Sequence, residues 1–196
     1  MSDLTGQPEL SDRLSQIPKN EPFPVVGLVI FFVGMVMVAY GITALWFGMR
    51  EVMDVGGYCA EGGPYVVRQH CPDGAELLIF TGIPIGIISL FIALLGGAKS
   101  AKGAAGLLLL GWPALFISLG YNFIDYAINP PEGMGSTAGW WVCGILFALM
   151  GLPALAGIPM LVKAIQPERR NAVLAVFLIA AAAGVVIGIQ VANAAD

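Results

Sequence analysis

The stretch "VVGLVIFFVGMVMVAYGITALWFGM", residues 25–49, decides the fold class of this chain, because it contains no charged side chain. A helix needs about 20 mostly apolar residues to cross the hydrocarbon core of a bilayer. The run is longer than the apolar core of a secretory signal, which is typically about 7–15 residues, and it follows a polar tail. We therefore predict that residues 25–49 form a retained transmembrane helix.

Four further apolar runs follow along the chain. The composition agrees with a membrane protein, since 58% of the 196 residues are hydrophobic, 11% are charged and the mean hydropathy is +0.84, whereas a soluble domain has about 25% charged residues. The predicted spans are residues 25–49, 77–97, 104–127, 139–162 and 172–192. The sequence thus predicts an all-α, polytopic integral membrane protein, with a bundle of five transmembrane helices over residues 23–196.

The Lys and Arg residues between the spans predict the orientation, because short cytoplasmic segments carry an excess of them. Seven lie on one side of the predicted bundle and two, Arg50 and Arg68, lie on the other. The seven are Arg13, Lys19, Lys99, Lys102, Lys163, Arg169 and Arg170. We therefore expect a multi-pass protein of the plasma membrane, with a cytoplasmic tail over residues 1–22 and an extracytoplasmic loop between the first two spans.

Two cysteines, Cys59 and Cys71, bracket that loop. Disulfides persist outside the cytoplasm, and closing a loop of this length stabilises a fold by about 3 kcal/mol in the entropy model. We predict a structural disulfide. Two alternatives stay open: a redox pair in which Arg68 and His70 acidify Cys71, although the spacing is not C-x-x-C, and a metal site formed by both cysteines with His70 and Asp73.

Small residues recur at helical spacing in several spans, and they let membrane helices approach closely. The first predicted seam is Gly27, Gly34, Gly41 and Gly48, at intervals of seven residues, and the second is Ala180, Gly184, Gly188 and Ala192, at intervals of four. Gly82 and Gly86 repeat the second spacing. We expect these seams to serve packing within the chain, with contact to another membrane subunit as the alternative.

Prolines interrupt three of the predicted spans. They are Pro84, Pro113, Pro153 and Pro159. Each lacks an N–H group and can kink a helix. A broken helix can also line a transport site through its freed carbonyls. We expect static kinks here, because no inverted repeat accompanies the prolines.

One polar face stands out in the third span. Ser118, Asn122 and Asp125 lie at steps of four and three residues, so they share one side of a helix. Tyr121 and Tyr126 flank them near the predicted extracytoplasmic end. This face is a candidate site for a quinone or a lipid head group, or it marks the membrane interface, where such residues are common.

No catalytic motif is visible in the sequence. The chain has one histidine, and it lacks the nucleophile, phosphate-binding and zinc-protease motifs. The few basic residues are dispersed, which disfavours nucleic-acid binding. We therefore expect no enzyme activity, no cofactor and no metal, with membrane lipids as partners.

The segment "MREVMDVGGYCAEGGPYVVRQHCPDG", residues 49–74, resembles the first outer loop of a group of small actinobacterial integral membrane proteins with a C-x-x-G-G-P-Y segment and a later Cys-Pro. The resemblance implies an actinobacterial plasma membrane and assigns no activity. The architecture is also similar to that of claudin-like proteins, whose first outer loop holds a disulfide.

The abundance of small-residue seams and the scarcity of buried polar groups favour a non-catalytic function. The leading hypothesis is an accessory or structural subunit of a membrane assembly, or a homo-oligomer. The alternatives are a small-molecule or lipid transporter or binder that uses the proline-broken helices, and an extracytoplasmic thiol–disulfide protein.

Overall fold

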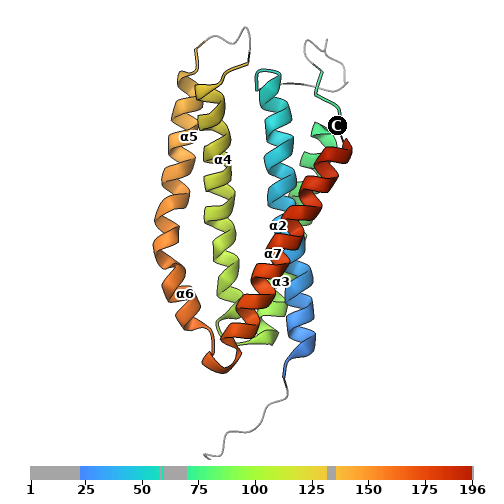
Figure 1. The fold of residues 1–196 in the computed structure, drawn as a ribbon, viewed down its shortest axis with the longest axis vertical. Coiled ribbons are helices and arrows are strands. Elements are labelled where there is room, and N and C mark those ends of the chain that lie inside the picture. Colours follow the sequence, from blue (N-terminus) through green and yellow to red (C-terminus); the bar gives the residue numbers. More distant parts are fainter. Residues whose placement is uncertain (1–22, 58, 60–69, 132–135, 196) are drawn as a thin grey trace, which may run out of the picture.

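The computed structural model describes residues 23–57, 59, 70–131 and 136–195, and all regular structure in these ranges is helical (Figure 1). The predicted tail, residues 1–22, lies outside the described residues. In chain order the elements are α2 (Val25–Asp54), α3 (Ala75–Ser100), the 3-10 helix η1 (Ala104–Leu110), α4 (Gly111–Ile128), α5 (Ala138–Gly151), the 3-10 helix η2 (Leu152–Gly157), α6 (Ile158–Ala164) and α7 (Pro167–Ala195).

Five helical segments are long and apolar enough to cross a membrane, as the sequence predicted. They are Val25–Asp54, Ala75–Ser100, Ala104–Ile128, Ala138–Ala164 and Pro167–Ala195. The helices extend beyond the apolar runs. In particular, α2 continues past Met49 through Arg50 to Asp54, so Arg50 belongs to the helix and not to the following loop.

Helix α2 is the centre of the first group of helices, in which it packs against α3 and α7. A Cβ atom on Gly27 would lie 2.6 Å from the carbonyl carbon of Lys99. One on Gly41 would lie 2.9 Å from the carbonyl oxygen of Gly82. The backbones of α2 and α3 therefore approach at a separation that larger side chains would prevent.

Helix α7 packs on α2 through the second predicted seam. A Cβ atom on Gly184 would lie 2.6 Å from the Cβ of Ala39, and one on Gly188 would lie 2.7 Å from Thr43. Figure 1 shows α7 crossing α2 obliquely, with α3 behind it. We call these three helices the α2–α3–α7 unit.

Helices α4 and α5 form an antiparallel pair beside that unit (Figure 1). Their contact uses a third set of small residues, which the sequence analysis did not identify. A Cβ atom on Gly120 would lie 3.1 Å from the carbonyl oxygen of Gly144, and one on Gly151 would lie 2.8 Å from Ile117. With α6, which continues the line of α5, this pair forms the α4–α5–α6 unit.

The contact between the two units varies along their length. Helix α2 contacts α4 much less extensively than it contacts α3 or α7. At one end, which we call the disulfide end because Cys59 and Cys71 lie there, polar side chains connect α2 to α4. At the opposite end, the basic end, η1 packs against both α3 and α6. The units are thus joined mainly at their two ends.

The prolines have different effects from one span to the next. Helix α3 continues as an α-helix through Pro84. Pro113 lies in the first turn of α4, a position at which helices tolerate proline. Pro153 and Pro159 begin η2 and α6, so the fourth span changes from α to 3-10 and back to α. The fourth span therefore changes helix type midway along its length, whereas the third changes from 3-10 to α near its start, after Leu110.

Candidate functional site

A polar cluster connects the two units at the disulfide end, and Arg50 is its centre. The guanidinium group of Arg50 donates a hydrogen bond of 2.9 Å to a carboxylate oxygen of Asp125, with which it also forms a salt bridge, and one of 3.3 Å to the side-chain oxygen of Asn122. The same guanidinium lies 5.1 Å from the ring centre of Trp46 and 4.9 Å from that of Tyr126. The Arg50 side chain thereby contacts Trp46 on its own helix and polar and aromatic groups within about one turn of α4.

Asn122 and Tyr126 complete the cluster with bonds in the opposite direction. The amide of Asn122, which is fully buried, donates to the carbonyl oxygen of Trp46 at 3.2 Å. The hydroxyl of Tyr126, which is 4% exposed, donates to a carboxylate oxygen of Asp54 at 2.5 Å. We call Arg50, Asp54, Asn122, Asp125 and Tyr126 the Arg50 cluster.

The Arg50 cluster connects α2 to α4, and its polar groups form hydrogen bonds with one another. Arg50, Asp54 and Asp125 line a small pocket of about 290 Å³. Among the described residues, the one buried side-chain polar atom without a partner is Nε of Arg170, which lies at the basic end and not in this cluster. The cluster therefore holds α4 against α2 without requiring a ligand.

The predicted polar face of the third span is brought together only in part. Asn122 and Asp125 both face Arg50. Ser118 does not join them, because its hydroxyl donates to the carbonyl oxygen of Leu115 on its own helix at 2.9 Å. Tyr121, 59% exposed, also lies outside the cluster. The residue that sequence reasoning missed is Arg50, whose charge was assigned to the following loop.

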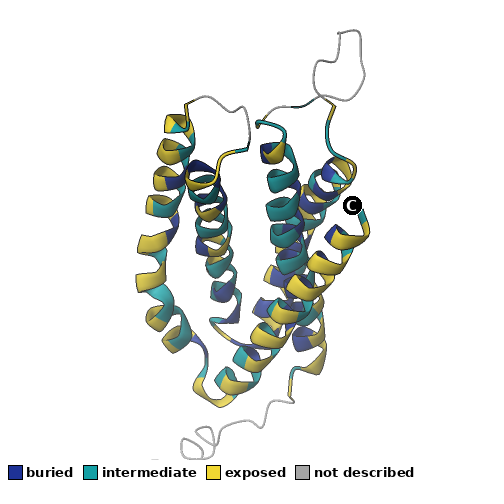
Figure 2. Ribbon diagram, turned by 45° about the horizontal axis from the view of Figure 1, so that its top comes forward, coloured by how far each residue is buried: buried dark blue, intermediate teal, exposed yellow. Residues whose placement is uncertain are grey.

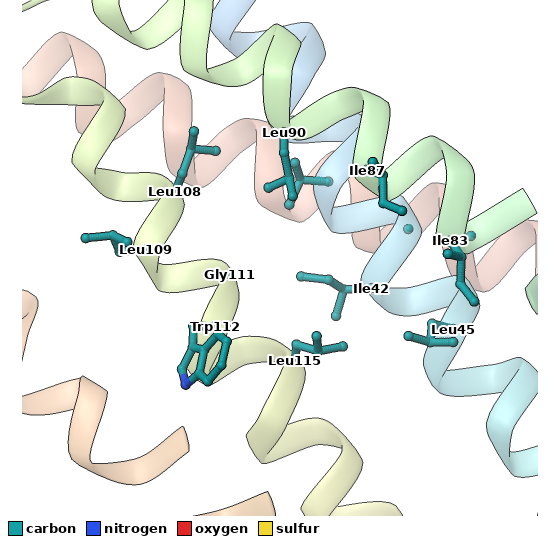
Figure 3. Close-up of a pocket in the computed structure, with 14 residues that line it drawn as sticks. Ile42, Leu45, Ile83, Ile87, Leu90, Leu108, Leu109, Gly111, Trp112 and Leu115 are labelled. Carbon is teal, nitrogen blue, oxygen red and sulfur yellow. The ribbon is translucent and has the colours of Figure 1, made fainter. Parts of the chain in front are cut away.

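An apolar pocket, which we call the interhelix groove, separates the two units below the Arg50 cluster (Figure 3). Its volume is about 390 Å³, within the range typical of small-molecule sites. The lining residues are Val38, Gly41, Ile42, Leu45, Gly82, Ile83, Gly86, Ile87, Leu90, Leu108, Leu109, Gly111, Trp112 and Leu115. All of them are aliphatic residues or glycines except Trp112.

The interhelix groove lies at the middle of α2 and α3. On α2 it extends from Val38 to Leu45, and on α3 from Gly82 to Leu90, which are the central parts of both helices. Figure 3 shows α2 and α3 on one side of the pocket and the chain from η1 into α4 on the other. The Arg50 cluster follows about one to two helical turns further along α2 and α4.

The groove opens toward the surroundings of the protein, and it offers few polar atoms. Ile87 is 54% exposed and Leu109 is 63% exposed, and both border the pocket. The indole N–H of Trp112 is already used, because it donates to the carbonyl oxygen of Met150 at 3.0 Å. A ligand in the groove would therefore be held by apolar contact and shape, and not by hydrogen bonds.

The hydrogen bond from Trp112 to Met150 also bears on the alternative that the proline-broken fourth span lines a transport site. Met150 lies in the last turn of α5, where carbonyl groups lose their helical partners. Trp112 satisfies one of these carbonyls and links α4 to the interrupted segment. This arrangement favours a static interruption at Pro153 over a carbonyl site for an ion.

The disulfide between Cys59 and Cys71 is formed, with 4.8 Å between the Cα atoms. Its sulfurs are bonded to each other, as the structural hypothesis requires, so neither cysteine is free to ligate a metal. The oxidised state of a redox pair would contain the same bond. Residues 60–69 of the loop, Arg68 included, lie outside the described residues. Cys143, in α5, is a free cysteine.

The predicted small-residue positions lie at contacts within the chain. Gly34 faces the backbone of Ala93, and a Cβ atom on Gly48 would lie 2.8 Å from Ile79. Ala180 and Ala192 are buried in the α2–α3–α7 unit. Internal packing thus occupies both predicted seams, and they are not free for a partner subunit.

Comparisons of this chain with protein-family models, with curated proteins and with solved structures found no match. The proposed function therefore rests on the geometry of the interhelix groove and of the Arg50 cluster.

Proposed function

We propose that this chain is a non-catalytic, multi-pass membrane protein that binds an apolar, membrane-dissolved ligand in the interhelix groove. The ligand class is a molecule with an extended hydrocarbon chain, such as a lipid. The observation that carries the proposal is an apolar pocket of about 390 Å³ at the middle of helices of membrane-spanning length.

The surroundings of the groove support this ligand class. At the middle of a membrane span the solvent is hydrocarbon, so molecules with apolar chains are the ones that reach the pocket. A pocket without free hydrogen-bonding groups gives no advantage to a polar ligand, which would lose its hydration without compensation. The Arg50 cluster and η1 hold the two sides of the groove at a fixed separation.

The proposed orientation follows the distribution of Lys and Arg. The basic end carries Lys99, Lys102 and Lys163 together with Arg169 and Arg170, and it is the proposed cytoplasmic end in the plasma membrane. The disulfide end is then extracytoplasmic, where a Cys59–Cys71 bond persists. A ligand would enter laterally from the bilayer, between these two ends.

A photoreactive fatty acid with a diazirine in the middle of its chain tests the proposal. The probe is applied to the protein in phosphatidylcholine vesicles, and the labelled residues are mapped by mass spectrometry. We expect labelling to concentrate on groove residues such as Ile42, Ile87 and Leu115. Equal labelling of all lipid-facing helices would overturn the proposal.

Two glycines provide a matched pair of variants for the same experiment. A Cβ atom on Gly111, which lines the groove, or on Gly139, which does not, meets no atom within 4 Å. Gly111→Phe should therefore fill the groove without disturbing the helices, and should reduce labelling of Ile42 and Ile87 at least several-fold. Gly139→Phe should leave the labelling unchanged.

One observation favours the accessory-subunit hypothesis as a second candidate. Within α5, η2 and α6, all of which the structure describes, Gly144 and Gly151 are the buried residues. Figure 2 shows the rest of these helices as exposed or intermediate. A partner helix could pack along this exposed span. Purification from the native membrane in a mild detergent, followed by identification of co-purifying proteins, tests this candidate: a stoichiometric partner supports it, and recovery of the chain alone contradicts it.

A further inference from the structure

Two turns lie against each other at the basic end, and a backbone hydrogen bond connects them. The N–H group of Gln166, between α6 and α7, donates to the carbonyl oxygen of Lys102, between α3 and η1, at 3.0 Å. The next residue, Gly103, has a φ of +84°, and a Cβ atom there would collide with the carbonyl group of Ala164. Only glycine permits this close approach of the two turns.

The paired turns gather basic side chains from three helices. Lys99, Lys102 and Lys163 are exposed, whereas Arg169 and Arg170 are half-buried. The guanidinium of Arg169 donates to the carbonyl oxygen of Ser100 at 3.2 Å, and that of Arg170 donates to the carbonyl oxygen of Ile165 at 3.2 Å. The first bond fixes the start of α7 against the end of α3, and the second connects α7 to the turn that follows α6. We call the five basic residues the basic surface.

Within the described residues, few acidic side chains lie near the three lysines of the basic surface. Glu168 is the one acidic residue in the two turns, residues 99–103 and 163–170. Within the part of the chain that the structure describes, no salt bridge engages Lys99, Lys102 or Lys163. Lys99, Lys102 and Lys163 therefore present three exposed positive charges that can interact with an anion.

The position of these charges identifies the kind of anion. Leu94 and Leu95, one turn before Lys99 on α3, are 48% and 60% exposed, so apolar side chains that suit hydrocarbon lead directly into the basic surface. Lysines at such a boundary extend their ammonium groups to the level of the lipid head groups. An anionic membrane surface attracts each such residue appreciably.

We propose that the basic surface binds the phosphate groups of anionic phospholipids. Lysine and arginine side chains are the usual partners of phosphate oxygens. The proposal does not depend on the interhelix groove, because it concerns the head group and not the hydrocarbon chain. Phosphatidylglycerol and phosphatidylcholine with the same acyl chains differ in the head group alone, so comparing them separates the two proposals.

Native mass spectrometry in detergent, with dioleoyl phosphatidylglycerol or dioleoyl phosphatidylcholine added, tests the proposal. We expect the full chain to bind phosphatidylglycerol more tightly than phosphatidylcholine. Neutralising the exposed lysines in Lys99→Gln, Lys102→Gln and Lys163→Gln should lower the affinity for phosphatidylglycerol about five-fold per lysine. Retention of the full preference in the triple variant would overturn the proposal.

Two acid-to-amide variants provide the matched control for net charge. Glu168→Gln, within the basic surface, should raise the affinity for phosphatidylglycerol, because it removes the neighbouring negative charge. Glu76→Gln, which makes the same charge change on an exposed residue near the disulfide end, should not. Equal effects of the two variants would show that overall charge alone controls binding, and would contradict a localised surface.

Discussion

At the residue scale, glycines on α2 allow close helix packing, because the backbone of a neighbouring helix occupies the space where a side chain would lie. Gly34 lies against the backbone of Ala93 on α3, whereas Gly139 on α5 has open space around it. Gly34→Ala should therefore destabilise the fold by about 1–3 kcal/mol, because the added methyl group forces the helices apart. Unfolding by sodium dodecyl sulfate in mixed micelles measures this change.

The control for that prediction is Gly139→Ala. It introduces the same methyl group into a helix without a collision, and alanine favours a helix over glycine by up to about 1 kcal/mol. We expect its stability to be unchanged or slightly raised. Equal destabilisation by the two substitutions would mean that α2 and α3 do not meet at Gly34.

Arg50 and Asp125 provide the second prediction at this scale, because their side chains interact directly at 2.9 Å across the two units. In a double-mutant cycle, Arg50→Ala and Asp125→Ala should show a coupling energy of about 1–3 kcal/mol. The single variants should each destabilise the fold, since each leaves a partly buried charge without its partner. Additive effects within about 0.5 kcal/mol would contradict the pairing.

At the scale of the element, the interrupted fourth span is held by Trp112. Its indole N–H reaches the carbonyl oxygen of Met150, just before η2 begins. Trp112→Phe keeps an aromatic ring but removes this donor, which should cost about 1 kcal/mol. We expect faster hydrogen exchange in η2, measured by mass spectrometry. Trp141→Phe, on the exposed side of α5, should leave that exchange unchanged.

The five spans could be predicted from the sequence because each is a continuous apolar run, which is a local signal. The interruption of the fourth span was foreseeable from Pro153 and Pro159, but the 3-10 start of the third span was not, because "AAGLLLL" at 104–110 reads as an ordinary apolar helix. The approach of α4 to α5 was also missed: Gly144 and Gly151 repeat the seven-residue spacing of the first seam, but Gly120 on the facing helix has no glycine four or seven residues away.

The candidate site depends on contacts between distant parts of the chain, which are harder to predict from the sequence than a local apolar run. The spacing of Asn122 and Asp125 correctly placed them on one side of a helix. The partner, Arg50, is 72 residues away from Asn122, and a charge after an apolar run is normally taken as the end of a span. The helix continues through Arg50 because α4 supplies the groups that pair with it. The volume of the interhelix groove arises from the arrangement of three helices, which a single sequence does not specify.

At the scale of the whole molecule, the arrangement is two helical units that are joined at their ends and separated by an apolar pocket at mid-height. Close packing at glycines makes the α2–α3–α7 unit continuous along its length, whereas α4 meets α2 mainly through the Arg50 cluster. This division accounts for the proposed function, because the groove lies where the two units are not in contact.

The central claim is that the interhelix groove holds an apolar molecule from the membrane. Native mass spectrometry of the protein extracted gently from its own membrane tests this claim most directly. We predict that the wild type and Gly139→Phe carry one apolar adduct per chain, and that Gly111→Phe, which fills the groove, lacks it. An adduct of equal abundance in all three proteins, or in none of them, would contradict the account.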